Sequence, residues 1–180
     1  MGFKKYVLFI KEKVCEIIHK DPMKYRLERY RMNGAIIGEN VRAFSPICSS
    51  EDYLIKVGNN VTISTGVVFC THDNSAIKVF DNATDFVGKI IIGDCSFIGM
   101  NTILMGGVTL PEHCIVGAGS VVTKSFTQKG CVIAGNPARI IGSIDNIKES
   151  KADNVFNFQG MNASQKRNEI LAHPERYLEK

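Results

Sequence analysis

The chain has 180 residues, of which 44% are hydrophobic and 22% charged, and its formal net charge at pH 7 is +4. This composition is typical of one globular domain with modest appendages, so we do not expect disorder. The small positive surplus argues against a nucleic-acid-binding protein, whose basic residues cluster on one face or helix, but it is compatible with one anionic ligand.

Residues 1–33 are predicted to form an N-terminal helical segment. Apolar side chains recur at helical spacing between residues 3 and 19, at Tyr6, Ile10, Val14, Ile17 and Ile18. Asp21-Pro22 is typical of a helix start and predicts a second helix over Met23–Met32. A basic amphipathic helix can lie on a membrane surface. We expect the first helix instead to pack against its own domain or a partner subunit.

The sequence gives no signal for export, membrane insertion or metal binding. The apolar run Tyr6–Ile10 is shorter than that of a signal peptide. No stretch reaches the roughly 20 apolar residues of a membrane span. The six cysteines form no CxxC pair and no Cys/His cluster at zinc spacing. We therefore expect a reduced, cytoplasmic protein without a metal cofactor.

A six-residue repeat runs through the middle of the chain, residues 34–142. Steps of six residues give the aliphatic series Ile92, Ile98, Leu104, Leu110, Val116 and Val122. The residues four positions further on are mostly small: Ser96, Thr102, Val108, Cys114, Ser120 and Phe126. This period fits neither an α-helix nor an alternating strand. It predicts a prism-like solenoid with three short strands and about 18 residues per turn, unlike a β-sandwich, whose turns have no fixed period.

The repeat is interrupted twice. Phe69 and Ile92 are separated by 23 residues, which is not a multiple of six and predicts an extruded loop at about 71–90. Ile37 and Val57 are separated by 20 residues, which predicts a smaller irregularity around Ser45–Asp52. Insertions in solenoids become loops on one face, where binding often takes place.

Residues 143–180 are predicted to be a partly helical C-terminal tail. The segment after Gly142 is polar as far as Ser164, and short helices are expected near Ser164–Ala172 and after Pro174. This tail is a docking element or a loose end, and we expect no chemistry there.

Four histidines are candidates for acid–base chemistry. His19 and His173 fall in the terminal helices, and His113 falls at a repeat corner, so all three are expected at the surface. His72 lies where the regular coil gives way to the predicted loop, on the rim of the prism, where it can face a neighbouring subunit. Position alone leaves a catalytic role for His72 open.

Four phrases between about Ile55 and Gly142 resemble the sugar and polysaccharide O-acetyltransferases of the hexapeptide-repeat family. They are "IKVGNNVTISTGVVFCTHD", "GKIIIGDCSFIGMNTILMGGVTL", "IVGAGSVVTKS" and "IAGNPARIIG". The resemblance implies a left-handed parallel β-helix, here an all-β solenoid with N-terminal helices and a short C-terminal helical tail. It also implies a homotrimer with each active site in the cleft between two adjacent prisms.

The resemblance also assigns roles within the site. His72 is the residue that matches the catalytic base of the family. Asp73, or Asp52 and Glu51 in the other irregularity, are candidates to orient the imidazole or to hold the acceptor. Asp52 falls near a family position that contacts the acceptor sugar, with a two-residue difference in length.

The cofactor implied by the resemblance is acetyl-CoA. Gly117-Ala118-Gly119 would offer open backbone to the pantetheine arm. Thr123 and Lys124 would meet the pantetheine or the phosphates of CoA, and Arg139 the region of its 3′-phosphate.

The predicted reaction is therefore O-acetylation of a sugar or polysaccharide precursor. A hydroxyl becomes a useful nucleophile when an imidazole removes its proton, and backbone N–H groups can stabilise the oxyanion. Alternatives are an N-acyltransferase acting on a nucleotide-linked amino sugar and a non-catalytic β-helix scaffold. A covalent route through Cys70 is also conceivable, although the family transfers the acyl group directly.

Overall fold

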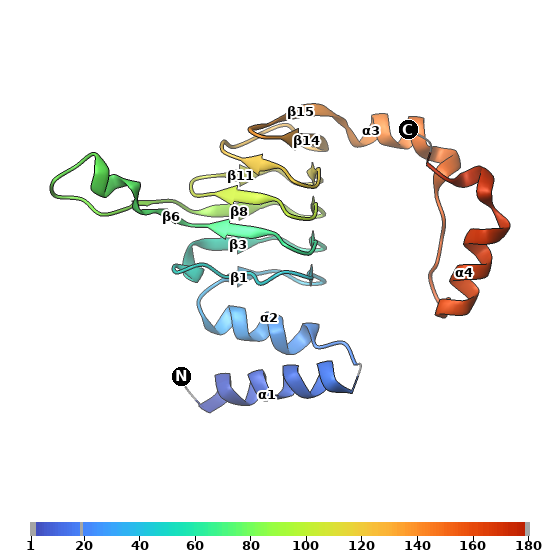
Figure 1. Ribbon diagram of the computed structural model, residues 1–180, viewed down its shortest axis with the longest axis horizontal. Coiled ribbons are helices and arrows are strands. Elements are labelled where there is room, and N and C mark those ends of the chain that lie inside the picture. Colours follow the sequence, from blue (N-terminus) through green and yellow to red (C-terminus); the bar gives the residue numbers. More distant parts are fainter. Residues whose placement is uncertain (1–2, 19, 179–180) are drawn as a thin grey trace. The chain divides into compact units, whose positions relative to one another are not determined.

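The computed structural model describes residues 3–18 and 20–178 (Figure 1). These residues divide into two compact units, one ending at Gly142 and the other beginning at Ser143. The first unit contains two helices and a stack of short strands, and the second contains further helices. Each unit is described by itself.

Three sheets form the stack, and the chain visits them in turn. The first sheet contains β1 (Ile36–Ile37), β3 (Ile55–Val57), β8 (Ile90–Ile92) and β11 (Thr109–Leu110). The second contains β2 (Arg42–Ala43), β4 (Thr62–Ile63), β9 (Phe97–Ile98), β12 (Ile115–Val116), β14 (Cys131–Gly135) and β15 (Ala138–Ser143). The third contains β5 (Val68–Cys70), β10 (Ile103–Met105) and β13 (Val121–Val122).

Strand pairing confirms the predicted 18-residue turn. Ile91 pairs with Thr109, Phe97 with Ile115 and Ile103 with Val121, each 18 positions apart and each in parallel register. The six aliphatic residues of the repeat each expose 1% or less of their surface, so every coil buries one side chain on each face. The result is a continuous apolar column whose stability is a sum over neighbouring coils.

Both predicted interruptions of the repeat are present. Ile36 pairs with Lys56 across 20 residues, and that coil contains the short 3₁₀ helix η1 (Asp52–Leu54). Ile55 pairs with Ile90 across 35 residues, because an arm projects from the stack between them (Figure 1). This arm is built on the antiparallel pair β6 (His72–Asp73) and β7 (Phe86–Val87), with the 3₁₀ helix η2 (Asn74–Lys78) between the two strands.

The corners between coils restrict which residues can stand near the aliphatic ones, either through a positive φ or through the close approach of the next coil. Asn40, Asn60, Cys95 and His113 occupy equivalent corners with positive φ, a conformation that asparagine tolerates better than most residues. Gly99 lies so close to the next coil that a Cβ there would be 2.6 Å from the Ala118 nitrogen. Glycine at that point allows adjacent coils to stack at the spacing of a parallel sheet.

The helices at the N-terminal end of the stack are α1 (Phe3–Ile17) and α2 (Met23–Met32). The second has the bounds predicted from the sequence, and the Asp21 carboxylate accepts the Met23 N–H at 2.9 Å. The apolar face of α1 was expected to pack on its own domain or on a partner subunit; it does not pack on its own domain, because Tyr6, Ile10 and Val14 are exposed, and packing on a partner subunit stays a prediction. The side of α1 that packs on α2 carries Glu12, whose ion pairs with Arg26 and Arg29 are the specific contacts there.

The second unit contains α3 (Ile144–Lys151), η3 (Ala152–Asn154), α4 (Ala163–Ala172) and η4 (Pro174–Arg176). Helix α4 begins one residue before the predicted helix, and the residues after Pro174 form a single 3₁₀ turn. Helix α3 was not predicted; it begins at a capping box between Ser143 and Asn146. Among residues 3–18 and 20–178, no helix combines the length and apolar character needed to cross a bilayer.

Candidate active site

His72 lies at the point where the third sheet ends and the arm begins. Strand β5 runs to Cys70, the wholly buried Thr71 follows, and His72 is the first residue of β6, where it pairs with Val87. Successive side chains of an extended chain point to opposite sides, so the burial of Thr71 turns His72 outward. About a third of the His72 side chain, 35%, remains exposed.

The imidazole of His72 is hydrogen-bonded to Glu51 from the preceding coil. The distance from His72 Nδ1 to Glu51 Oε2 is 2.9 Å. A carboxylate can only accept a hydrogen bond, so Nδ1 carries the proton and the other ring nitrogen, Nε2, presents a lone pair. The hydrogen bond that His72 donates to Glu51, followed by the negative charge of Glu51, raises the pKa of His72 above its ordinary value. The ring is therefore oriented and made more basic by one contact.

Glu51 is in turn held by the buried hydroxyl group of Thr71. Thr71 Oγ1 lies 2.6 Å from Glu51 Oε2 and 2.6 Å from Ser49 Oγ. Because the carboxylate has no proton to give, the Thr71 hydroxyl donates to Glu51. Hydrogen bonds from Thr71 first and His72 second lower the pKa of Glu51, which keeps this carboxylate ionised.

The two predicted acidic residues near the site have other partners. Asp52 is 8% exposed, and its Oδ1 accepts the backbone N–H of Ser49 at 2.7 Å. Asp73 Oδ1 accepts the backbone N–H of Ser75 at 2.9 Å and caps η2. Of the three carboxylates considered from the sequence, the one that contacts the imidazole is Glu51.

A pocket of about 250 Å³ lies beside His72. Polar and apolar residues line it together, namely Cys70, Thr71, His72, Asp73, Phe86, Val87, Gly88, Met105, Gly106 and Gly107. The glycines allow backbones to meet closely, since a Cβ on Gly88 would lie 2.3 Å from the Gly107 nitrogen. The Gly88 N–H donates to Thr71 O and the Gly107 N–H donates to Lys89 O. Gly106 lines the same pocket, and among the described residues its N–H makes no backbone hydrogen bond outside the strand ladders, so it is a candidate donor to a ligand oxygen.

Cys70 also lines this pocket, but its environment does not favour a thiolate. Burial first, and the negative charge of Asp73 second, raise the pKa of the Cys70 thiol above its ordinary value. A reactive cysteine needs the opposite, because the thiolate is the nucleophile.

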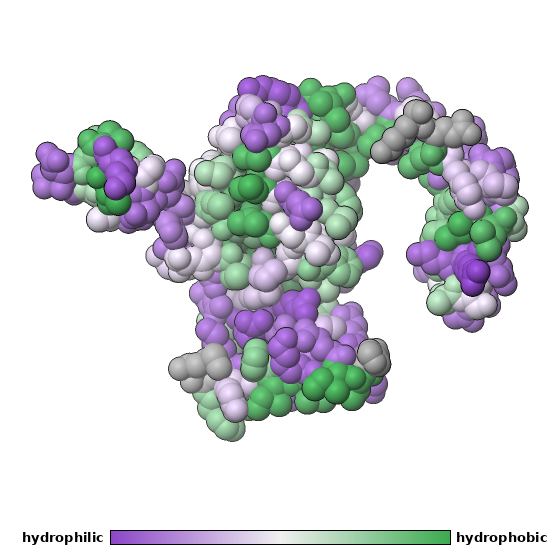
Figure 2. All heavy atoms as spheres, viewed as in Figure 1, coloured by the Kyte–Doolittle hydropathy of each residue, from purple (hydrophilic) through white to green (hydrophobic). Residues whose placement is uncertain are grey.

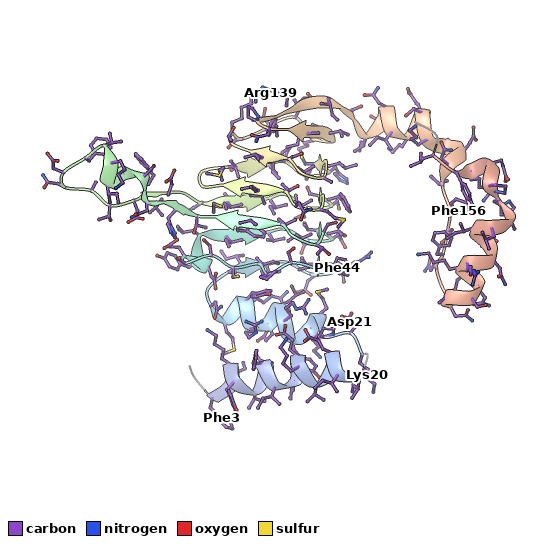
Figure 3. The ribbon with its side chains drawn as sticks, viewed as in Figure 1. Phe3, Lys20, Asp21, Phe44, Arg139 and Phe156 are labelled. Atoms are coloured by element: carbon purple, nitrogen blue, oxygen red, sulfur yellow. The ribbon has the colours of Figure 1, made fainter. Side chains whose placement is uncertain are left out.

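The last coils form a second groove, of about 420 Å³. It brings the side chains of Lys124 and Arg139 to one surface, together with Ser125, Phe126, Thr127, Gln128 and Ile140. Figure 3 labels Arg139 at the end of the stack that is opposite α1. Two cations in one concave surface can bind a phosphate or another anion.

The other predicted cofactor contacts lie close to that groove in the sequence. Thr123 is exposed and precedes Lys124. Ala118 is exposed at a corner of the stack. Gly117 has a packing role, since a Cβ there would lie 2.9 Å from the Ala134 Cβ.

The remaining histidines do not join either surface. His113 is exposed at a corner with φ 58°, and His173 forms ion-pair contacts with Glu175 at 3.0 Å and Glu169 at 3.6 Å. His19 lies outside the described residues. Within the described part of the chain, no group of three His, Cys, Asp or Glu side chains is placed to hold a metal ion.

Sequence comparisons connect the chain with transferases. The family model "Bacterial transferase hexapeptide (six repeats)" matches residues 89–124. Protein CapG of Staphylococcus aureus is 37% identical over 150 residues, which cover 80% of this chain and 86% of CapG. Galactoside O-acetyltransferase of Escherichia coli strain K12 is 31% identical over 110 residues, which cover 61% of this chain and 54% of that protein.

Solved structures with the same fold include two acetyltransferases. A maltose O-acetyltransferase from Clostridium difficile 630 matches with a TM-score of 0.52 and 23% identity, over 76% of this chain and 88% of that chain. A galactoside acetyltransferase in complex with coenzyme A matches with a TM-score of 0.59 and 22% identity, over 91% of both chains. At 23% and 22% identity, these two similarities show a shared fold and do not by themselves show a shared reaction.

Proposed function

The chain belongs to the hexapeptide-repeat acyltransferase family, and on that premise we propose that it is an acetyl-CoA-dependent O-acetyltransferase. Its acceptor is a hydroxyl of a sugar or polysaccharide precursor, and its coils are the left-handed parallel β-helix of the family. The observation that carries this proposal is the Glu51–His72 contact at the wall of the pocket. It supplies an oriented imidazole at the place where an acceptor hydroxyl can enter.

The proposed reaction is a direct transfer. His72 Nε2 removes the proton of the acceptor hydroxyl as its oxygen attacks the thioester carbonyl of acetyl-CoA. The Gly106 N–H stabilises the oxyanion that forms. When the carbon–sulfur bond breaks, the imidazolium returns the proton to the departing thiolate, so the products are an acetyl ester and free CoA. Glu51 stabilises the imidazolium between these two steps.

The acceptor contacts predicted from the sequence, Asp52 and Asp73, remain part of the proposal. Asp73 lines the pocket and is exposed, so its carboxylate can accept a hydrogen bond from a second sugar hydroxyl. Asp52 is buried against Ser49, which favours a role in positioning the segment that carries Glu51.

The CoA contacts are assigned to the groove at the last coils. Lys124 and Arg139 are proposed to bind the phosphates, and Thr123, Gly117 and Ala118 to lie along the pantetheine arm.

The role of Arg139 can be tested with the acetyl thioester of dephospho-CoA, which lacks the 3′-phosphate. Wild type should prefer acetyl-CoA, and Arg139→Ala should lose most of that preference through a several-fold rise in KM. Lys129→Ala is the matched control, since Lys129 is exposed and paired with Glu112. An unchanged preference in Arg139→Ala would contradict this assignment.

A homotrimer completes the proposal. The arm carries exposed apolar side chains, namely Ile77, Val79, Phe80, Phe86 and Val87. A neighbouring prism packed against them would close the pocket into a cleft between subunits. We expect a solution mass near three times 19.9 kDa. A monomer with full activity would contradict a site shared between subunits. The proposed location is cytoplasmic.

The test of the reaction is thiol release from acetyl-CoA against a panel of sugars, amino sugars and amino acids. We expect release with a hydroxyl acceptor and an ester product that hydroxylamine cleaves. Turnover of amines alone would identify an N-acyltransferase. Absence of CoA binding in calorimetry, together with no release on any acceptor, would identify a scaffold.

A further inference from the structure

Helix α1 exposes a continuous apolar stripe. Its residues follow a spacing of three, four, four and three along the helix and share one side of it, within an arc of about 80°. They are Phe3, Tyr6, Ile10, Val14 and Ile17, and each is exposed, from 42% for Ile10 to 84% for Phe3. Ile18, directly after the helix, extends the stripe. Figure 2 shows hydrophobic atoms along the edge of α1 that faces away from α2.

The opposite side of α1 is held to the fold by charge. Glu12 is only 4% exposed, and its carboxylate oxygens accept hydrogen bonds from Arg26 Nε at 3.0 Å and Arg29 Nη2 at 2.9 Å. Arg26 also donates to Glu16 at 2.8 Å. Water-soluble helices bury their apolar side and expose their charges. In α1 the charged side faces the fold and the apolar stripe faces outward, where it can bind another molecule.

The charges at the borders of the stripe indicate what that partner is. Lys4 and Lys11 lie along one border and Lys13 along the other. The two acidic residues of the helix, Glu12 and Glu16, point toward α2 and are paired with arginines there. The contacts of Lys4 with Glu28 and of Lys13 with Glu16 are exposed ion pairs, which hold a lysine weakly.

We infer that α1 is an interfacial helix that binds the surface of a bilayer containing anionic lipid. The stripe would enter the boundary between headgroups and acyl chains, and the lysines would extend to the headgroups on both sides. A second copy of the chain is a poorer occupant. Any pairing of two α1 stripes places lysine borders against lysine borders, whereas an anionic surface complements both. The inference concerns a surface separate from the proposed transferase site.

The test is flotation of the full-length protein with lipid vesicles. Vesicles of phosphatidylcholine and phosphatidylglycerol at roughly three to one should bind the protein at least tenfold more tightly than vesicles of phosphatidylcholine alone, and added salt should weaken binding. The double variant Ile10→Ser/Val14→Ser should lose at least tenfold in affinity because the stripe is interrupted. Lys11→Glu should lose roughly tenfold on the anionic vesicles.

Matched controls make the same chemical changes elsewhere. Leu171→Ser removes an exposed apolar side chain of α4, and Lys151→Glu reverses an exposed charge of α3; both should bind vesicles like wild type. All variants change exposed positions, and circular dichroism and solution mass check their fold. Equal binding to both vesicle types, or full binding by the double variant, would overturn the inference. If the wild type did not bind vesicles and the double variant had a lower solution mass than the wild type, the stripe would be a contact between copies of the chain.

Discussion

The regular coils differ in construction from the segments that interrupt the repeat. The regular coils lie between Ile92 and Val122, and the two interrupting segments are 44–54 and 71–90. In the regular coils each face contributes one buried aliphatic residue, and the buried hydroxyl groups of Ser96, Thr102 and Ser120 donate to backbone carbonyls of the coils. In the interruptions, Ser49, Glu51, Thr71 and His72 converge from two neighbouring coils into one hydrogen-bonded cluster. A stacked repeat leaves no room for such a cluster, because every position inside it is packed against its equivalent 18 residues away. This difference indicates that the repeat forms the rigid support, whereas its interruptions carry the polar groups of the candidate site.

Two histidines offer the sharpest test of this contrast. His72→Asn should lower kcat/KM by about 10²–10⁴-fold, because the general base is removed. His113→Asn makes the same change at a regular corner, where Asn40 and Asn60 already occupy equivalent positions, and should leave kcat/KM within about twofold. Thiol release measures both variants. Near-wild-type transfer by His72→Asn would remove the basis of the proposed mechanism.

Stability should show the reverse contrast. Leu104→Ala in β10 should lower the free energy of unfolding by about 2–5 kcal/mol, because Leu104 is completely buried in the apolar column. Asn82→Ala in the arm should change it by less than about 0.5 kcal/mol, because Asn82 is an exposed polar residue outside the apolar set of the arm. Denaturant unfolding at one fixed protein concentration measures both. If Asn82→Ala were the more damaging change, the tip of the arm would have to be part of the folding core.

Glu51→Gln should have an intermediate effect on catalysis, with a shift in pH dependence. The neutral imidazole is the active base, so kcat/KM falls as the pH drops through the pKa of His72. Glu51 raises that pKa, so removing its charge should move the acid limb of the profile to lower pH. At neutral pH we expect a loss of about tenfold, because the imidazolium loses its partner. A limb displaced to higher pH would contradict the assigned role, and Asp73→Asn serves as the comparison variant.

The smallest effect is expected at Cys70. Cys70→Ala should keep kcat/KM within about threefold of wild type, because the raised pKa of this thiol keeps it protonated and the proposed transfer is direct. Thiol release and mass spectrometry of the enzyme mixed with acetyl-CoA measure this. A loss as large as that of His72→Asn, or an acetylated Cys70, would replace the direct route with a covalent one.

The site itself could be predicted from the sequence only in part. The break in the period places His72 at the rim, the family resemblance points to it as the base, and Glu51 is one of three acidic candidates. Their contact depends on the paths of two insertions, and the 21 positions between them do not correspond to a whole number of repeats. Thr71 could have been noticed as the neighbour of His72, whereas nothing in the sequence pointed to Ser49. Helix α3 was missed because it is short and polar, and its start depends on a local cap.

What the sequence determined by itself was the period: one aliphatic residue every six positions dictates which side chains point inward and which coils are neighbours. It also determined that residues 3–17 form an amphipathic helix. Only the tertiary structure decided which side of that helix packs on the fold, because the Glu12 contacts with Arg26 and Arg29 join helices whose docking no periodicity describes. The same holds for Glu51 and His72. Periodic burial is a local property of the chain, whereas the pairing of single polar groups depends on where irregular segments end in space.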